Sequence, residues 1–273
     1  MSGSSKWFLY FSGLPLILFS GLSFGVEMMG PMSADNQNPF SVIYGSTRCC
    51  SGRVLDEGVS ESGVGYHVSS NFQRNANSKG GLIIIDGESE VWTLSYRRGF
   101  AGDWEAGLVL PIIEHSGGYL DRLIVNWHDW FGMPQGGRDA ALNSQLSYTI
   151  ENQDRGSVSL ISPERGLGDI VLYAGKALSS NLSVRGSVKI PTGKYESLMG
   201  SGGYDMGLSL DYQRQVASNW NWGAVLSVSH LGQGDETGLR LQNFLGAASS
   251  HLAYRVRPNI ALKLQWAFNS PAY

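Results

Sequence analysis

From residue 62 onward, apolar and polar residues alternate along the chain with a period of two. The segment NIALKLQWAF (259–268) puts five large apolar side chains on one face, and it puts Ala, Lys, Gln and Ala on the other. Successive side chains of a strand point to opposite faces, so this pattern predicts strands. Several segments approach the roughly 9–11 residues that cross a bilayer at a tilt, whereas soluble strands more often have about 5–6. We predict eleven strands, at residues 62–73, 82–99, 104–114, 143–151, 156–162, 168–178, 181–191, 203–215, 219–231, 242–256 and 259–269.

The connections between these strands alternate between short and long. AGD (101–103), SSN (179–181), VASN (216–219) and RPN (257–259) are short, whereas the connections that begin at HSGG (115–118) and PTG (191–193) are long. Outer-membrane barrels have short turns on the periplasmic side and long loops outside. The sequence therefore predicts an all-β protein, an antiparallel transmembrane β-barrel of about twelve strands, of which about eleven are present.

The composition is compatible with this fold but does not decide it. Charged residues make up 16% of the chain, against about 25% in an ordinary soluble domain. Few charges, 36 glycines and 11% aromatic residues suit a membrane barrel, and a soluble β-sandwich can share them. A net charge of −3 without a basic run excludes nucleic acid as the partner.

The first residues predict export. Lys6 precedes an apolar run, and small residues at Ser23 and Gly25 precede Glu27, as in a cleavable signal peptide over residues 1–25. A retained anchor is the alternative. Residues 26–61 are polar and rich in Gly and Ser, so we expect an irregular segment with one short ordered piece at FSVIYG (40–45). Residues 62–273 form the barrel domain. We expect the outer membrane as the location, with its lipid, lipopolysaccharide and the barrel-assembly machinery as partners.

Several motifs carry a family resemblance over residues 62 to the end. They are DGE (86–88), HSGG (115–118), WHDWFG (127–132), PQGGR (134–138), GLGD (166–169) and PTG…GSGGYD (191–205). With them the chain resembles an uncharacterised family of proteobacterial outer-membrane β-barrels, a domain of unknown function. More distantly, it is similar to outer-membrane carriers linked to aromatic-compound degradation. The resemblance implies location and architecture, and no site residue follows from it.

If the apolar faces meet lipid, a set of charged side chains points into the lumen. Two interpretations stay open: ion pairs across strands that fill a narrow barrel, which we favour, or a charged constriction that selects solutes. The candidate lumen-lining residues are Arg97, Glu105, Arg185, Lys189, Asp205, Asp211, Arg255 and Lys263.

Residues 120–131 break the period of two. Their apolar residues repeat every three or four positions, which predicts an amphipathic helix in the longest external loop. We expect Asp121 to cap its start and Gly132 to end it, with Pro134 preventing continuation. The apolar face could close the barrel mouth as a lid, or lie on the membrane surface. The candidate lid residues are Leu123, Ile124, Trp127, His128, Trp130 and Arg138.

No motif supports catalysis, so we predict that the protein is not an enzyme. His115 and Ser116 are adjacent, but no nucleophile-elbow pattern accompanies them. Cys49 and Cys50 lack ligand partners at metal spacing, and the acidic loop at Asp235 is more simply a solvated loop. We therefore expect neither a cofactor nor a metal.

The function predicted is a passive or facilitated channel for a small solute, gated by the helix-bearing loop. The alternatives are a structural or surface-interaction barrel with a filled lumen, and an enzyme that acts on envelope lipids. Eleven strands is an odd number, whereas bacterial single-chain barrels have an even one. We therefore expect the barrel to lack its last strand, as a truncated sequence would. The strands near 62–73 and 259–269 should then have open edges.

Overall fold

The computed structural model describes residues 30–31, 37–45, 52–76, 82–138, 141, 144–152, 156–232, 234, 242–258 and 260–271. They form one antiparallel sheet of twelve strands and two short helices, α1 (Pro39–Val42) and α2 (Leu120–Phe131). The predicted signal peptide, Cys49 and Cys50, and Asp235 lie outside the described residues. The strands are β1 (Ser60–Ala76), β2 (Leu82–Phe100), β3 (Trp104–Ser116), β4 (Ser147–Asn152), β5 (Gly156–Leu160), β6 (Glu164–Leu167), β7 (Ile170–Ser179), β8 (Leu182–Ile190), β9 (Asp205–Ala217), β10 (Trp220–His230), β11 (Phe244–Arg257) and β12 (Ile260–Asn269).

All eleven predicted strands are present, and β6 is the one that the pattern missed. β6 has only four residues, and they do not alternate between apolar and polar. It is a strand because it pairs with residues Ile112 to His115 at the end of β3. FSVIYG was expected to hold a short ordered piece, and its first residues belong to the single helical turn α1, where Asn38 caps the first turn and Pro39 takes its first position.

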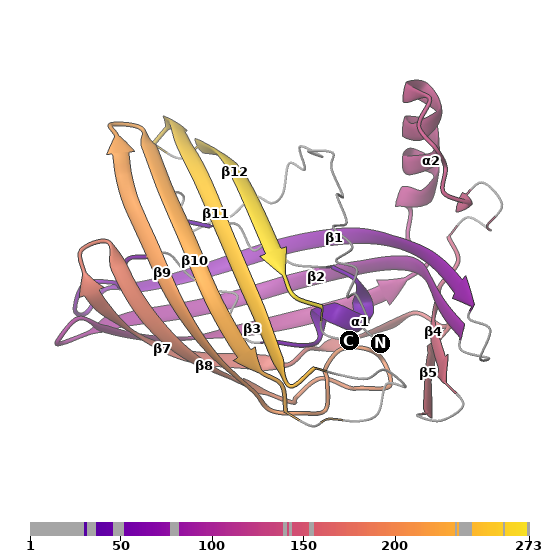
Figure 1. The fold of residues 1–273 in the computed structure, drawn as a ribbon, viewed down its shortest axis with the longest axis horizontal. Helices are drawn as coiled ribbons and strands as arrows, with labels where there is room; N and C mark the ends of the chain where they lie inside the picture. The colour runs from indigo at the N-terminus through magenta and orange to yellow at the C-terminus, as the bar shows by residue number, and fades with distance from the viewer. Residues whose placement is uncertain are drawn as a thin grey trace, which may run out of the picture.

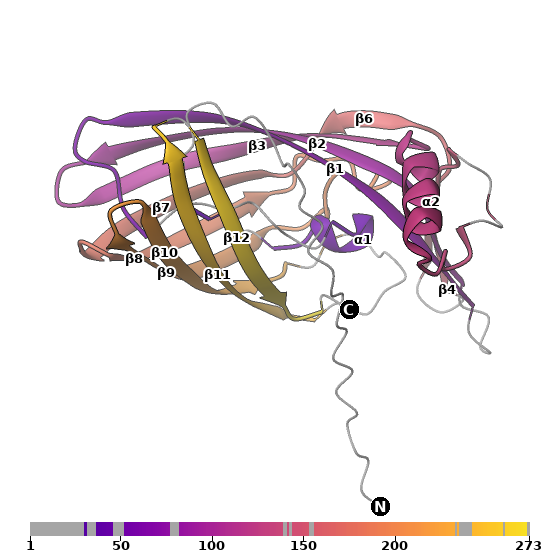
Figure 2. The same ribbon diagram turned by 90° about the horizontal axis from the view of Figure 1, so that it is seen from above.

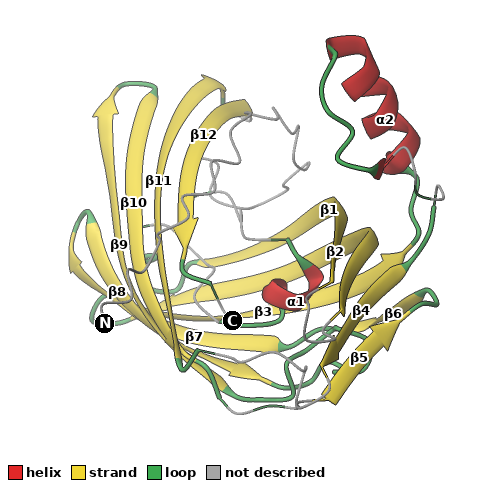
Figure 3. Cartoon of the chain, turned by 45° about the vertical axis from the view of Figure 1, so that its right-hand side comes forward, coloured by secondary structure: helices red, strands yellow, loops and turns green. Residues whose placement is uncertain are grey.

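The sheet curves round like an incomplete barrel wall (Figures 1 and 3). Nine strands follow one another by antiparallel pairing, in the order β1, β2, β3, β7, β8, β9, β10, β11, β12. β4 pairs with the first residues of β2 beyond the end of β3, and β5 pairs with β4. The short connections β2–β3, β7–β8, β9–β10 and β11–β12 therefore lie at one end of the sheet, and β4, β5, β6 and α2 lie at the other.

In the described part of the chain, β1 and β12 are the two edges of the wall that these nine strands form. Eight successive antiparallel pairings separate them, so both run in the same direction. This confirms the predicted open edges. Antiparallel closure would require a strand that runs opposite to both.

The sheet places its apolar residues on the surface and its polar residues inside. On β9, Met206, Leu208 and Leu210 are 61%, 53% and 41% exposed, whereas Asp205 and Asp211 are fully buried. The same alternation runs along β12, where the odd-numbered residues are less exposed than their neighbours up to Gln265. The concave face is therefore polar and the convex face apolar, the reverse of a soluble barrel.

A hydrophobic cluster lies at the end of the sheet that carries the long loops. It joins α1 to the β4–β5 hairpin, so the hairpin and the helical turn cover this end together (Figure 3). Its buried members are Phe40, Ile43, Tyr44, Ile85, Leu146, Tyr148, Ile150, Val158, Leu160, Leu198 and Leu231.

Helix α2 (Leu120–Phe131) ends at the predicted residue, but its start differs from the prediction. Its N-cap is Tyr119, and no side chain of the helix caps it. The carboxylate of Glu88 on β2 accepts hydrogen bonds from the backbone N–H groups of Tyr119 (2.9 Å) and Leu120. Asp121, the predicted cap, instead accepts from Arg138 (2.8 Å). Gly132 ends the helix in the left-handed conformation, as predicted.

Candidate functional site: charged groups beneath the N-terminal segment

Six of the eight candidate lumen residues are buried on the concave face. Arg97 is 8% exposed, and Glu105, Arg185, Lys189, Asp205 and Asp211 are 3% exposed or less. Arg255 on β11 is exposed and Lys263 on β12 is half-buried. These last two are separated by β9 and β10 from the strand that carries Arg185 and Lys189. Whether any of the eight lines a path for solute stays a prediction.

Arg185 on β8 is the centre of the first group of charges. Its Nε lies 2.8 Å from Glu105 Oε1, and its Nη1 lies 3.1 Å from Asp211 Oδ2. Glu105 also lies 3.6 Å from Arg97, which in turn pairs with Glu61 at 2.6 Å. The group therefore alternates in sign across β1, β2, β3, β8 and β9.

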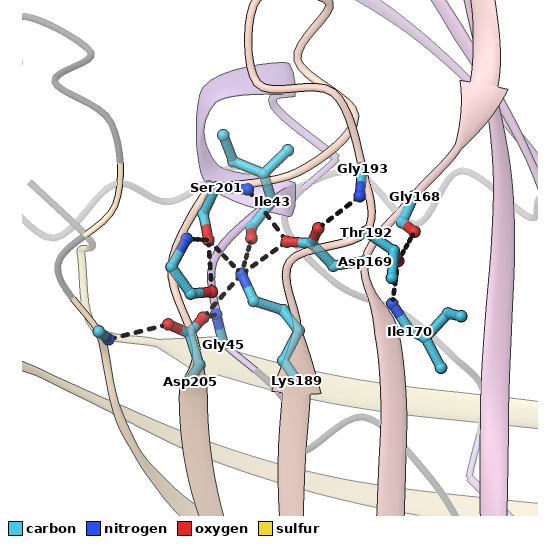
Figure 4. Close-up of polar contacts among 12 residues, drawn as sticks. Ile43, Gly45, Gly168, Asp169, Ile170, Lys189, Thr192, Gly193, Ser201 and Asp205 are labelled. Atoms are coloured by element: carbon cyan, nitrogen blue, oxygen red, sulfur yellow. Dashed lines mark hydrogen bonds and ion pairs between the residues drawn. The ribbon is translucent and has the colours of Figure 1, made fainter.

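Lys189 is the centre of the second group (Figure 4). Its ammonium lies 3.0 Å from Asp169 Oδ2 and 2.9 Å from Asp205 Oδ2. Lys189 and Asp205 are direct neighbours on β8 and β9, so the predicted pairing across strands is present here. The ammonium also donates to Ser201 Oγ and to the backbone carbonyl of Ile43. One buried cation thus has two carboxylates and two neutral acceptors.

Asp169 binds the loop between β8 and β9 at the same site through hydrogen bonds. Its two carboxylate oxygens accept from the backbone N–H groups of Gly193 (2.9 Å) and Ser201 (3.0 Å). The Thr192 hydroxyl donates to the carbonyl of Gly168 at 2.7 Å. GLGD and PTG…GSGGYD, quoted above as family motifs, therefore meet at the Lys189 site (Figure 4).

Both groups hold the N-terminal part of the chain, which we call the inner segment (residues 37–45 and 52–59). The carbonyl of Ile43, which accepts from Lys189, belongs to this segment. In the same segment, Gly45 N donates to Asp205 Oδ2 at 2.8 Å. Leu55 N donates to Glu105 at 3.0 Å, and the carbonyl of Arg53 accepts from Arg185 at 3.2 Å. The inner segment therefore lies across the concave face, where Figures 2 and 3 show α1 within the curve of the sheet. The sequence did not predict this placement.

Buried charges of this kind are costly to desolvate, and partners on both sides offset that cost. Each group here joins strands and at the same time binds main-chain atoms of the inner segment. The arrangement can therefore hold the inner segment in one position. Removing one charge would leave its partners buried and uncompensated.

A third polar cluster joins β2, β3 and β4. Ser89 Oγ lies 2.8 Å from His115 Nδ1 and 3.2 Å from the Tyr148 hydroxyl, and His115 Nε2 donates to the carbonyl of Leu198 at 3.1 Å. The structure thus pairs His115 with Ser89, not with its sequence neighbour Ser116. Ser89 and His115 are 4% and 0% exposed, so no substrate reaches the hydroxyl in this arrangement.

The candidate lid residues lie on or beside α2, which buries none of its side chains. Leu123, Trp127 and Trp130 are 57%, 43% and 75% exposed. Ile124 and His128 are half-exposed, and Arg138 pairs with Asp121. The helix stands apart from the sheet, to one side of the ends of β1 and β2 (Figure 1), so the structure does not bring this face over the mouth. The lid stays a prediction, and the elements that cover this end are α1 and the β4–β5 hairpin.

Two kinds of feature are absent from the described residues. These residues contain no cluster of three or more His, Cys, Asp or Glu side chains that could hold a metal ion. They also contain no helix that is both long and apolar enough to span a membrane.

Comparisons with known proteins show the family of the chain, and a solved structure is weakly similar to it. A family model described as "Protein of unknown function (DUF3187)" matches residues 16–273. No curated protein matches the chain. A crystal structure of the Ralstonia pickettii toluene transporter TbuX is similar with a TM-score of 0.35 and 9% identity, over 80% of this chain and 67% of the transporter chain. A likeness this weak carries no argument about activity. Because the family model covers most of its length, the chain belongs to the DUF3187 family of proteins of unknown function.

Proposed function

We propose that the protein is an outer-membrane β-barrel through which a small solute passes without being chemically changed. The observation that carries this proposal is the reversed alternation of the sheet. Leu262, Leu264 and Trp266 on β12 are 61%, 48% and 54% exposed, while charged groups such as Lys189 and Asp205 are buried. A chain in water would expose the second set and bury the first. Lipid outside and polar groups inside explain both.

Aromatic residues on the convex face support the same location. Near the short connections, Trp104 follows the β2–β3 turn, and the rings of Trp220 and Tyr254 pack 4.7 Å apart. Toward the other end of β2, Tyr66 and Trp92 pack at 4.6 Å. From Phe100 to Trp92 the strand covers roughly 26 Å at about 3.3 Å per residue. At a tilt of about 35–45° this length spans roughly 18–21 Å across the bilayer, which fits within the apolar band of about 25 Å that aromatic girdles flank in outer-membrane barrels.

Within the curve of the sheet, the side formed by β10, β11 and β12 is the one along which solute could pass. The polar contacts of the inner segment described above fall on β3, β8 and β9. Toward the long loops, the concave face of β10, β11 and β12 carries the small side chains Ser227, Ala247, Ser249 and Ala267, whereas Lys263 and Gln265 lie on this face nearer the short connections. We propose that solute moves between this wall and the inner segment. The outer-membrane lipid, lipopolysaccharide and the barrel-assembly machinery are the partners that this function requires.

A second candidate is a structural barrel with a filled lumen. The buried ion pairs around Arg185 and Lys189 favour it, because they fix the inner segment across the concave face. An envelope-lipid enzyme has less support, because the Ser–His pair formed by Ser89 and His115 is buried.

Single-channel recording in planar bilayers separates these candidates. The purified full chain should give discrete conductance, and the Lys189→Met variant should give larger or more frequent openings because the inner segment is released. Deleting residues 117–138 tests the helix as a lid, which predicts a rise in conductance. A full chain that inserts but never conducts, with or without Lys189→Met, would identify a filled barrel. Recovery as a soluble monomer would contradict the membrane location, and phospholipid hydrolysis that Ser89→Ala abolishes would identify an enzyme.

A further inference from the structure

Helix α2 is an amphipathic helix whose polar side is covered by its own chain. Gln135 Nε2 donates to the carbonyl of Val125 at 3.0 Å and to Asp129 Oδ1 at 2.6 Å. His128 Nδ1 donates to the carbonyl of Pro134 at 2.9 Å. Arg138 pairs with Asp121 at 2.8 Å. Residues 134–138 therefore run back along the side on which positions 121, 125, 128 and 129 lie.

The opposite side is apolar and faces away from the protein. Leu123, Trp127, Trp130 and Phe131 are 57%, 43%, 75% and 62% exposed, and the rings of Trp127 and Phe131 pack 4.5 Å apart. A helical hairpin in water would cover its apolar side with the returning chain and leave its polar side to solvent. This hairpin does the reverse, so the partner of the apolar side lies outside the described chain.

Helix α2 begins close to the end of the apolar band on the convex face. On β3 the convex apolar residues run from Trp104 to Ile112 and end at Glu114, which is paired in register with Glu90 and lies 3.8 Å from Arg165. This charged row marks where the convex face leaves the hydrocarbon. α2 begins six residues further on, within about 20 Å at roughly 3.3 Å per residue.

Glu88 fixes the start of α2 at that distance. Besides accepting from the N–H groups of Tyr119 and Leu120, its side chain lies against Gly118, which has φ +68°. A Cβ at Gly118 would lie 1.9 Å from the Glu88 carboxyl carbon, so glycine is required there both for space and for its backbone conformation. The helix is therefore held by the barrel wall and is not on a loose tether.

We propose that α2 lies with Leu123, Trp127, Trp130 and Phe131 in the headgroup and acyl-chain boundary of the lipid leaflet around the barrel, which rests on the membrane location proposed above. Trp and Phe favour this boundary, and an interfacial helix of low net charge needs such a stripe. The four side chains expose roughly 500 Å² together, at on the order of 200 Å² for each if fully exposed. A stable contact with a second copy needs about 800 Å² per partner. The stripe is thus too small to hold a dimer together. Its contact with lipid would add to the lipid contact of the barrel wall.

Depth-dependent quenching tests this placement in the full chain. In a Cys49→Ser, Cys50→Ser background, Trp130→Cys carries an environment-sensitive fluorophore, and the protein is placed in nanodiscs of phosphatidylethanolamine and phosphatidylglycerol. Asn126→Cys, exposed on another side of the same helix, is the matched control. Nitroxide near the headgroups should quench the label at 130 severalfold more than the label at 126, with a blue-shifted emission at 130 only. Equal quenching at both positions would overturn the proposal.

Three further measurements test a second copy or the barrel mouth as the partner of the apolar side, and test the membrane location separately. In nanodiscs loaded with one copy each, quenching at 130 should persist, whereas loss of the difference would identify a second copy as the partner. A label at 130 that neither headgroup nitroxide nor aqueous iodide quenches would place the helix over the mouth. Leu264→Cys, on the convex face of β12, reports the barrel itself. If nitroxide deep in the acyl chains quenches the label at 264 but the label at 130 stays unquenched by lipid, only the placement of α2 fails.

Discussion

Arg185 and Glu105 form a buried ion pair of 2.8 Å although a whole strand, β7, lies between β8 and β3. Gly175 is the residue of β7 that is in register with both of them. Because it has no side chain, the arginine crosses above it. A Cβ at Gly175 would lie 2.7 Å from Arg185 Cγ. The absence of a side chain at Gly175 therefore lets Arg185 on β8 reach Glu105 on β3. Glu105 in turn accepts a hydrogen bond from the N–H group of Leu55 in the inner segment.

Gly175→Ala should consequently destabilise the barrel by about 1–3 kcal/mol, as overpacking of a filled interior does. Gly186→Ala on the next strand is the matched control, because its new Cβ would meet only one atom, at 4.0 Å. We expect the urea midpoint of unfolding in detergent micelles to fall for the first variant and to stay within error for the second. Equal midpoints for both would show that Arg185 has another route to Glu105.

Lys189→Met should loosen the inner segment. The change leaves Asp169 and Asp205 buried without their cation, a situation that costs about 3–5 kcal/mol when one partner of a buried pair is removed. We expect a cysteine at Ile43, in the background without Cys49 and Cys50, to react faster with a maleimide after this substitution. Lys176→Met removes an exposed lysine that lies over Trp104, 5.2 Å from the ring centre, and should not change the rate. Unchanged labelling with Lys189→Met would mean that the segment is held elsewhere.

The strands could be predicted from the sequence because each residue of a wall with one apolar and one polar face must suit the face on which it lies. Leu264 faces out and Gln265 faces in whatever strand lies beside them, so the alternation is readable locally. The strand order is different. β3 pairs with β7 only because β4 and β5 leave the main wall, and nothing local to Val109 or Val171 indicates that the two face each other.

The candidate site could be predicted only in part for the same reason. Lys189 and Asp205 sit on consecutive strands of the wall, and their pairing follows from alternation and a hairpin. The inner segment contributes backbone atoms: the carbonyls of Ile43 and Arg53 and the N–H groups of Gly45 and Leu55. Every residue type has these atoms, so the sequence holds no signal for them. The anchor of α2 was missed because Glu88 lies 31 residues before Tyr119.

Glu88→Gln should free the start of α2 while the sheet stays folded. A hydrogen bond to a charged group contributes about 1.5–3 kcal/mol, and the carboxylate accepts two of them here. We expect amide hydrogen exchange to rise in residues 118–124 and to stay constant in β9 and β10. Glu114→Gln is the control, because Glu114 is half-exposed and its pair with Arg165 is long, at 3.8 Å. If both variants exchange like the unmodified chain, other contacts hold the helix.

The proposed membrane location predicts that an arginine on the convex face costs more free energy the deeper it lies in the bilayer. Leu264 lies near the middle of β12 on the convex face, whereas Val256 is on the same face of β11 beside the short connection to β12. Arginine on a lipid-facing wall costs about 2–4 kcal/mol at the middle of the bilayer and about 0–1 kcal/mol near its surface. Leu264→Arg should therefore lower the folded yield in phosphatidylcholine vesicles strongly, while Val256→Arg should leave it nearly unchanged. Folded and unfolded protein are separated by their mobility on unheated gels. Both side chains are about half-exposed, 48% each, so a water-exposed wall would tolerate the two arginines equally. Equal tolerance would thus contradict the proposal that lipid covers this face.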